Sequence, residues 1–391
     1  MAADDDPKAL LGAVLGQRWR LIRHIGSGGL GLVFEAEDLQ GEGRRAIKLL
    51  RREFCDEPEI IDRFLIEALA GARIDHPGVT KVHEAARAED GTPYLVVELL
   101  LGQSLQARMN RGRVPVEQAA PIAHGILDAL GAAHAAGVVH RDLKPDNVFL
   151  AQDASGKIAV KLLDFGLSRV MDAAGGMQRK TRTGMLLGTP GYMSPEQVRN
   201  SKDADERSDL WSVGIIFYEM LTATPAFQAE NEFARITQVL TNDPTPIEQV
   251  APQYAHWAPF FQRALAREPA DRFQSAQEMA AALLAVAREG HMPESHLQAI
   301  PASTLMPSAP PPSRSAPPAG SALSEPPPRF PRSDTAISAG SVPRAAHTLA
   351  PMVQVVTPTH HPRRVSLVLA LAITFLALAI GFLVGFVAGR L

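Results

Sequence analysis

The pattern of hydrophobic and polar residues divides the chain into stretches of different character. Residues 18–288 alternate short apolar runs of β-type with longer segments of helical period, among ordinary numbers of charges. Residues 289–364 lack periodic apolar positions, and residues 365–389 carry no charge. We therefore expect an N-terminal tail at 1–17, one folded region, a linker and an apolar C-terminal helix, in that order.

The folded region contains predicted elements of both kinds. The residues between 60 and 73 have the period of a helix that buries one face. The apolar runs that predict short strands cover residues 21–22, 32–34, 46–50, 148–150 and 160–163. This region is therefore expected to be a mixed α and β domain.

The linker is unusually rich in proline. Residues 293–362 contain 16 of the 31 prolines of the chain, together with abundant Ser and Ala. Such a composition cannot bury a core, so it predicts an extended, disordered linker with polyproline II character. We favour a passive spacer over a ligand for SH3-like domains.

The uncharged run at 365–389 is 25 residues long and contains no proline. As a helix it spans about 37 Å, enough to cross a hydrocarbon core of roughly 30 Å. A buried core helix is the alternative, but no globular sequence surrounds it. Arg363 and Arg364 precede the run, so the linker side should be cytoplasmic. We predict a single-pass protein of the inner or cell membrane that contacts membrane lipid through this helix.

Within that run, Gly381, Gly385 and Gly389 are spaced four residues apart. Small residues at this spacing share one helix face and allow two membrane helices to approach closely. The pattern is compatible with a homodimer, although glycine is also frequent in membrane helices in general.

Composition and charge exclude several classes of protein. The single cysteine, Cys55, excludes an intramolecular disulfide and a Cys-rich zinc module. Residues 293–391 carry seven Arg and three acidic residues, so the net charge of −3 leaves −7 on the remainder of the chain. An acidic folded region makes a nucleic-acid partner unfavourable on electrostatic grounds.

A glycine-rich motif follows the first predicted strand. Gly26, Gly28 and Gly31 stand in the pattern G-x-G-x-x-G, which lets a backbone turn come close to phosphate groups. A dinucleotide-binding turn would continue into a helix, whereas here apolar β-type residues follow, which favours a hairpin. A glycine-rich hairpin without a ligand is the alternative.

One lysine, Lys48, interrupts the apolar strand at 46–50. Its ammonium needs an anion, which a phosphate or a carboxylate would supply. We choose Glu67 in the predicted helix as the carboxylate, although Glu53, Glu57 and Glu59 are alternatives nearer the start of that helix. A solvated charge on the helix surface is the other interpretation of Glu67.

The richest block of polar residues is His-Arg-Asp-Leu-Lys-Pro-Asp-Asn at 140–147. Asp164, followed by Phe and Gly, comes 22 residues after Asp142. Two carboxylates and the amide of Asn147 on adjacent loops suit a Mg²⁺–nucleotide site, because Mg²⁺ prefers oxygen ligands and shares them with phosphates.

These motifs, in this order and spacing, resemble those of the eukaryotic-type serine/threonine protein kinases, particularly the bacterial membrane-anchored ones, over about residues 18–288. The resemblance implies an α+β two-lobed fold, with a small β-rich N-lobe with one helix at 18–101 and a larger, mainly helical C-lobe at 102–288. It also implies ATP and Mg²⁺ as cofactors and proteins as substrates.

The resemblance assigns catalytic and metal-binding roles. Asp142 would accept or orient the proton of the substrate hydroxyl. Lys144 matches the Ser/Thr-specific form of this loop, and Lys48 would bind the α- and β-phosphates of ATP and pair with Glu67. Asn147 and Asp164 would hold Mg²⁺.

The resemblance also assigns an ATP-binding surface. The loop over the phosphates would comprise Ile25, Gly26, Ser27, Gly28, Gly29, Leu30, Gly31, Leu32 and Val33. The adenine ring would lie among Ile25, Val33, Ala46 and Phe149. Glu98 to Leu100 would form the hinge between the lobes, after a gatekeeper at Val97.

The segment at 180–184, which lies between Phe165 and Pro195, suggests regulation. Relatives commonly carry two autophosphorylated threonines in this region, so we predict Thr181 and Thr183 as phosphosites and Thr189 as a substrate-docking residue. Arg141, beside the catalytic aspartate, would pair with a phosphate. Both threonines could instead be plain loop hydroxyls.

Other matching residues are interpreted as structural. These are Glu196, which closes the docking loop, its expected partner Arg272, Asp209 in the following helix, and His140, which organises the backbone of the catalytic loop.

Two other functions compete with that of an active kinase. A membrane-tethered pseudokinase would bind ATP without transfer, and its hallmark would be loss of Lys48, Asp142, Asn147 or Asp164, all of which are present. A small-molecule kinase of related fold would lack the docking loop around Thr189, which is intact.

Overall fold

A computed structural model describes residues 6–153, 155–165 and 190–290, together with 292, 300, 304 and 305. Thr181, Thr183 and Thr189 lie outside these residues, and so does the apolar run at 365–389. No helix formed by the described residues combines the length and hydrophobicity that a membrane crossing requires.

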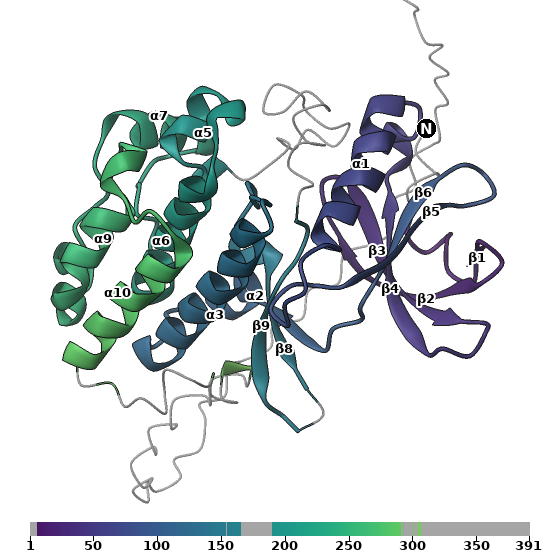
Figure 1. The fold of residues 1–391 in the computed structure, drawn as a ribbon, viewed down its shortest axis with the longest axis horizontal. Helices are drawn as coiled ribbons and strands as arrows, with labels where there is room; N and C mark the ends of the chain where they lie inside the picture. Colours follow the sequence, from purple (N-terminus) through teal and green to yellow (C-terminus); the bar gives the residue numbers. More distant parts are fainter. Residues whose placement is uncertain are drawn as a thin grey trace, which may run out of the picture. The chain divides into compact units, whose positions relative to one another are not determined.

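The N-terminal part of the chain forms a six-stranded antiparallel sheet in the order β1-β2-β3-β4-β6-β5 (Figure 1). Its strands are β1 (Val14–Leu15), β2 (Trp19–Ser27), β3 (Gly31–Asp38), β4 (Arg44–Leu50), β5 (Val82–Arg87) and β6 (Pro93–Val97). The sheet thus begins inside the stretch that the sequence pattern assigns to the tail, because Leu15 is apolar and buries against the next strand.

Helix α1 (Pro58–Gly71) packs on this sheet, against β5 and β6. Ile60, Ile61 and Phe64 are buried with Leu50 and Leu95 of the sheet. The helix begins two residues before the predicted one, since proline is well accommodated in the first turn of a helix. The opposite face of the sheet has its own core, which includes Trp19, Leu21, Phe34, Ile47 and Val96.

The C-terminal part is mainly helical. Its helices are α2 (Leu105–Met109), α3 (Val116–Ala135), α5 (Pro195–Arg199), α6 (Glu206–Thr222), α7 (Glu232–Thr241), α8 (Ile247–Val250), α9 (Ala258–Ala264) and α10 (Ala276–Glu289). Short 3-10 turns of this part lie at Pro145–Asn147, Pro190–Tyr192, Ser201–Asp203, Pro252–Trp257 and Pro269–Asp271, and another lies in the N-terminal part at Arg52–Phe54. Helix α3 lies beside both α6 and α10 (Figure 1). Its many Ala and Gly residues allow this close packing.

A small three-stranded sheet lies next to the polar motifs at 140–147 and 164. Its order is β7 (Gly102–Ser104), β8 (Val148–Gln152) and β9 (Ile158–Leu162). Residues 140–147 lead into β8, and Asp164 follows β9, so the antiparallel β8–β9 hairpin brings the two motifs together. The two-lobed architecture is confirmed, with a β-rich N-lobe carrying one helix and a helical C-lobe.

Two segments of the N-lobe are fastened to the end of β9. Val79 forms a parallel bridge with Leu162, whose N–H donates to the Gly78 carbonyl (2.8 Å) and whose carbonyl accepts from Thr80 N–H (3.0 Å). The Glu98 carboxylate lies 2.6 Å from Lys161 Nζ. Both attachments therefore involve neighbouring residues of one strand.

Candidate active site

A cavity of about 330 Å³ is lined by residues of both lobes. Predicted site residues that line it are Ile25, Gly26, Val33, Ala46, Lys48, Glu98, Leu100, Phe149 and Asp164. Val97, the expected gatekeeper, lines it too. Its walls are mostly apolar, and charged groups gather where Lys48 and Asp164 meet. Such a cavity suits a flat apolar ring attached to an anionic group.

Several lining residues were missed by sequence reasoning, among them Thr80, Val82, Leu95, Ser104 and Leu163. The pairing of residues across neighbouring strands would have predicted two of these lining residues. Leu95 lies opposite Lys48 in the β4–β6 pair, and Val82 lies opposite Val97 in the β5–β6 pair. Residues directly opposite one another share a face of the sheet, so pairing them would have extended the site.

The glycine-rich motif forms a hairpin turn between β2 and β3, as the flanking apolar runs predict. The Gly28 N–H donates to the Gly31 carbonyl (2.8 Å), and Arg51 Nε donates to the Gly28 carbonyl (3.0 Å). A side chain at Gly31 would place its Cβ 2.4 Å from the Leu49 carbonyl oxygen, so only glycine fits there. Gly29 lies in the turn itself.

Not every residue of the predicted phosphate loop has its side chain in the cavity. Leu30 is buried against α1, and Leu32 is buried in the core on the other face of the sheet. Ser27 Oγ lies 2.9 Å from His24 Nε2. These three can therefore serve the cavity through their backbone, while their side chains stabilise the hairpin.

Lys48 has a nearly buried side chain, and its Nζ lies 2.6 Å from Asp164 Oδ1. Burial by itself raises the pKa of the Asp164 carboxyl, but the charge and hydrogen bond of Lys48 outweigh it and hold that pKa below its ordinary value. Glu67 lies in α1, and its side chain is outside the described part of the structure. The sequence pattern gave no sign of the Lys48–Asp164 contact.

The Asp142 carboxylate is held from two sides. Its Oδ2 accepts hydrogen bonds from Lys144 Nζ (2.8 Å) and Asn147 Nδ2 (3.1 Å). Asn147 Nδ2 also donates to the Asp142 carbonyl (2.7 Å), because the 3-10 turn Pro145–Asn147 folds the amide back. These bonds fix the direction of the carboxylate and place a cation beside it.

Asp209, which is buried in α6, organises the backbone leading to Asp142. Its two oxygens accept from the N–H groups of His140 and Arg141 (2.8 Å each), and one also contacts His134 Nε2 (2.8 Å). His140 is fully buried, and its Nε2 lies 2.9 Å from the Leu163 carbonyl. These are the contacts of residues that position the loop.

Two non-glycine residues of the site adopt left-handed backbone conformations. Arg141 has a φ of 65° and Asp164 a φ of 61°. Each such residue costs about 1–3 kcal/mol and persists only where its surroundings fix it. For Arg141, Asp209 accepts from its N–H and Gln197 Nε2 donates to its carbonyl (2.8 Å).

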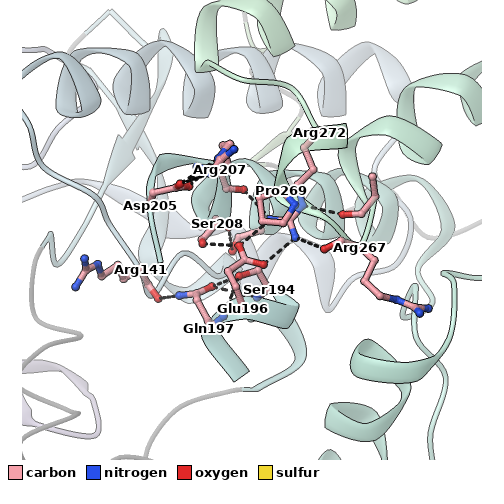
Figure 2. A network of polar contacts seen from close by, with 12 residues as sticks. Arg141, Ser194, Glu196, Gln197, Asp205, Arg207, Ser208, Arg267, Pro269 and Arg272 are labelled. Carbon is pink, nitrogen blue, oxygen red and sulfur yellow. Dashed lines mark hydrogen bonds and ion pairs between the residues drawn. The ribbon is translucent and has the colours of Figure 1, made fainter. Parts of the chain in front are cut away.

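Gln197 belongs to a buried polar network around Glu196 (Figure 2). Arg272 donates to both Glu196 oxygens (2.8 Å each), and Ser208 Oγ donates to one of them (2.7 Å). Burial alone would raise the pKa of Glu196, but the Arg272 hydrogen bonds and charge outweigh it and lower the pKa to about 2. The network thus joins α5 and α6 to the backbone of the catalytic loop.

Comparison with known proteins agrees with this geometry. The protein kinase domain family matches residues 19–284. The serine/threonine-protein kinase pkn3 of Myxococcus xanthus is 36% identical over 294 residues, which are 73% of this chain and 52% of that protein. The serine/threonine-protein kinase PknA of Mycobacterium tuberculosis is 35% identical over 304 residues, which are 76% of this chain and 68% of that protein.

Solved structures show the same fold. The crystal structure of the Mycobacterium tuberculosis PknI kinase domain superposes with a TM-score of 0.55 at 24% identity, covering 71% of this chain and 98% of that domain. The chain spans about half the length of pkn3. From the family match, the PknA relationship and the site geometry, the chain belongs to the protein kinase family, in its bacterial serine/threonine branch.

Proposed function

We propose that this chain is an active protein kinase that transfers the γ-phosphate of ATP to serine and threonine hydroxyls of proteins. One observation supports this most strongly. The Asp142 carboxylate is fixed by Lys144 and Asn147, in the loop that the β8–β9 hairpin joins to the Lys48–Asp164 pair.

The residues present fit ATP and Mg²⁺. Val33, Ala46 and Phe149 offer apolar walls for an adenine ring, and Lys48 offers a cation for phosphate oxygens. The carboxylate of Asp164 and the amide oxygen of Asn147 are ligands of the type that Mg²⁺ prefers. When bound, Mg²⁺ supplies positive charge to the phosphates.

The chain's own residues would then perform positioning and proton transfer. Asp142 is directed by its hydrogen bonds and accepts the proton of the substrate hydroxyl as the oxygen attacks phosphorus. Lys144, 2.8 Å from Asp142, adds positive charge where negative charge accumulates on the transferred group. The β2–β3 hairpin, whose Gly26 lines the cavity, would lie over the phosphates.

A transfer assay with labelled ATP and Mg²⁺ on the full chain tests the proposal. We expect label on the wild-type protein and a loss of about 10²–10⁴-fold in rate for Asp142→Asn, the range usual for a catalytic acid or base. ATP binding should persist in that variant. Asp243→Asn, at an exposed carboxylate outside the cavity, is the matched control. A wild-type chain that binds ATP but transfers nothing would instead support the pseudokinase alternative.

Regulation and anchoring complete the proposal. Thr181 and Thr183 would be autophosphorylated, and Thr189 would contact the substrate. Residues 365–389 would anchor the chain in the inner or cell membrane with the kinase domain in the cytoplasm, and their Gly381 face would allow a homodimer. Crosslinking of the full chain in membranes, with Gly385→Ile as the disruptive variant, tests the dimer.

A further inference from the structure

The chain returns to the C-lobe after its last helix. Met292 is buried in the C-lobe core. Ile300 forms an antiparallel bridge with Ile158 of β9, Thr304 is fully buried, and Leu305 packs against the same core. We name Ile300, Thr304 and Leu305 the linker anchor. All three lie beyond the family match and inside the stretch that composition assigns to a disordered linker.

The kinase domain contacts the linker anchor with two polar side chains. Arg111, which follows α2, donates to the Thr304 carbonyl (2.9 Å) and the Leu305 carbonyl (3.4 Å). Gln103 in β7 also donates to the Thr304 carbonyl (3.3 Å). Contacts to backbone carbonyls depend on the path of the segment and not on its side chains, so they fix where the chain runs.

Ile300 borders a second cavity of the C-lobe. This cavity, of about 470 Å³, is bounded by Pro121 of α3, Val160 of β9, Leu284 of α10 and Ile300 itself. His124, Lys157 and Arg288 also line this cavity, so it is apolar only in part. Ile300 itself packs against the C-lobe core, which removes apolar surface from water and stabilises the docked segment.

We propose that β7, the end of α2 and the edge of β9 form a docking surface whose occupant is the chain's own linker anchor. A bridge to the sheet edge, hydrogen bonds to consecutive carbonyls and apolar contacts all act on this one segment. Gln103 is adjacent to Ser104, which lines the ATP cavity. The linker is therefore fastened beside the hinge rather than released at the end of α10.

Hydrogen exchange on the full chain tests this docking surface. Ile300→Lys removes an apolar contact with the core and brings a positive charge toward Lys157 and Arg288, so we expect faster amide exchange in residues 103–111 and 157–160. The expected increase is about tenfold, the factor for losing one ordinary hydrogen bond. Ile337→Lys, the same change farther along the linker, should leave both regions at wild-type rates.

A variant on the domain side separates docking from folding. Arg111→Gln leaves the sequence of the linker anchor unchanged but removes the charged hydrogen bonds to the Thr304 and Leu305 carbonyls. The peptide containing Thr304 and Leu305 should therefore exchange faster in this variant. Amides of β4 and β6 should stay protected in both variants. The proposal would be overturned if the amide exchange rates were the same in the wild type and both variants for all three segments, namely 103–111, 157–160 and the 304–305 peptide.

The buried hydroxyl of Thr304 allows a variant that should strengthen docking of the linker anchor instead of weakening it. Its Oγ1 has no hydrogen-bond partner among the described residues, although the residue is fully buried. Replacing an unsatisfied hydroxyl by a methyl group of similar size removes a desolvation cost. Thr304→Val should therefore keep or slow exchange in the 304–305 peptide, and faster exchange there would contradict the docked geometry.

Discussion

At the scale of single residues, the site depends on charged groups held in partly buried positions. Lys48 is tolerated in a buried strand because Asp164 neutralises it, and the Asp142 carboxylate is tolerated beside Lys144 and Asn147. Each charge has a partner that also belongs to the site. A substitution at one of these positions therefore changes both the chemistry and the electrostatic balance of its neighbour.

Gly31 provides a residue-scale prediction. Its Cβ would meet the backbone oxygen of Leu49 at 2.4 Å, whereas a Cβ at Gly28 would have nothing nearer than 3.9 Å. Backbone cannot move aside cheaply, so Gly31→Ala should lower the free energy of unfolding by about 1–3 kcal/mol. Gly28→Ala is the matched control and should cost much less. Equal unfolding midpoints for the two variants in denaturant would refute this reasoning.

At the scale of elements, helices α5 and α6 act on the catalytic loop through polar contacts. Asp209 holds the N–H groups of His140 and Arg141, and Gln197 holds the Arg141 carbonyl. The Glu196–Arg272 pair fixes the helix that carries Gln197. The strained backbone of the loop is therefore maintained by helices that do not touch the cavity.

The Glu196–Arg272 pair predicts an acid-sensitive part of the stability. The pKa of Glu196 is about 2 in the folded state and about 4.5 in the unfolded chain. The folded state thus binds fewer protons, so this contribution is fully present above pH 4.5 and is lost as the pH falls toward 2. Removing one partner of a buried pair costs about 3–5 kcal/mol, which is the expected loss for Glu196→Gln at pH 7.

The contribution of the Glu196 carboxylate can be measured by denaturant unfolding of the wild type and of Glu196→Gln, at a series of pH values from 7 down toward 2. The difference in stability between the two proteins should shrink as the pH falls below 4.5. A difference that stays constant over that range would show that the carboxylate charge does not stabilise the fold.

Thr181 and Thr183 provide a prediction for the segment between the described parts of the C-lobe. Phosphate groups there would bring negative charge that an arginine can pair with. We expect the double variant, with both residues changed to Ala, to lose about tenfold or more of its rate on an added protein substrate. Ser201→Ala, in the 3-10 turn Ser201–Asp203, serves as the control. An undiminished rate in the double variant would remove these threonines from the regulation of the kinase.

The whole molecule shows where the sequence was informative. Short apolar runs and glycine spacing predicted the β2–β3 hairpin, β4 and α1, because local patterns encode these elements. The expected adjacency of the loops at 140–147 and 164 agrees with the hydrogen bonds of His140 and Asn147 to Leu163. The partner of Lys48 and the inward burial of Leu30 and Leu32 were not predictable, since they depend on contacts between strands distant in sequence. Composition also hid the linker anchor, because three docked residues do not change the average of a proline-rich stretch.

The uncharged run at 365–389 gives a prediction for the whole chain. Burial of this run in lipid is strongly favourable, so the full chain should sediment with membranes and a chain ending at residue 364 should not. Deleting residues 315–341 removes the same number of residues from the linker and should leave sedimentation unchanged. Recovery of the shortened chain in the membrane fraction would show that another segment binds lipid.

The attachments at the end of β9 have a mechanical consequence. Residues 78–80 are tied to Leu162, and Glu98 is tied to the adjacent Lys161, so two separate points of the N-lobe are pinned to one short piece of the C-lobe. A rigid body held at two neighbouring points can turn only about an axis near them. Any rotation of the lobes should therefore leave the end of the cavity beside Glu98 almost stationary and move parts of the N-lobe farther from it, such as the β2–β3 turn, through a longer arc.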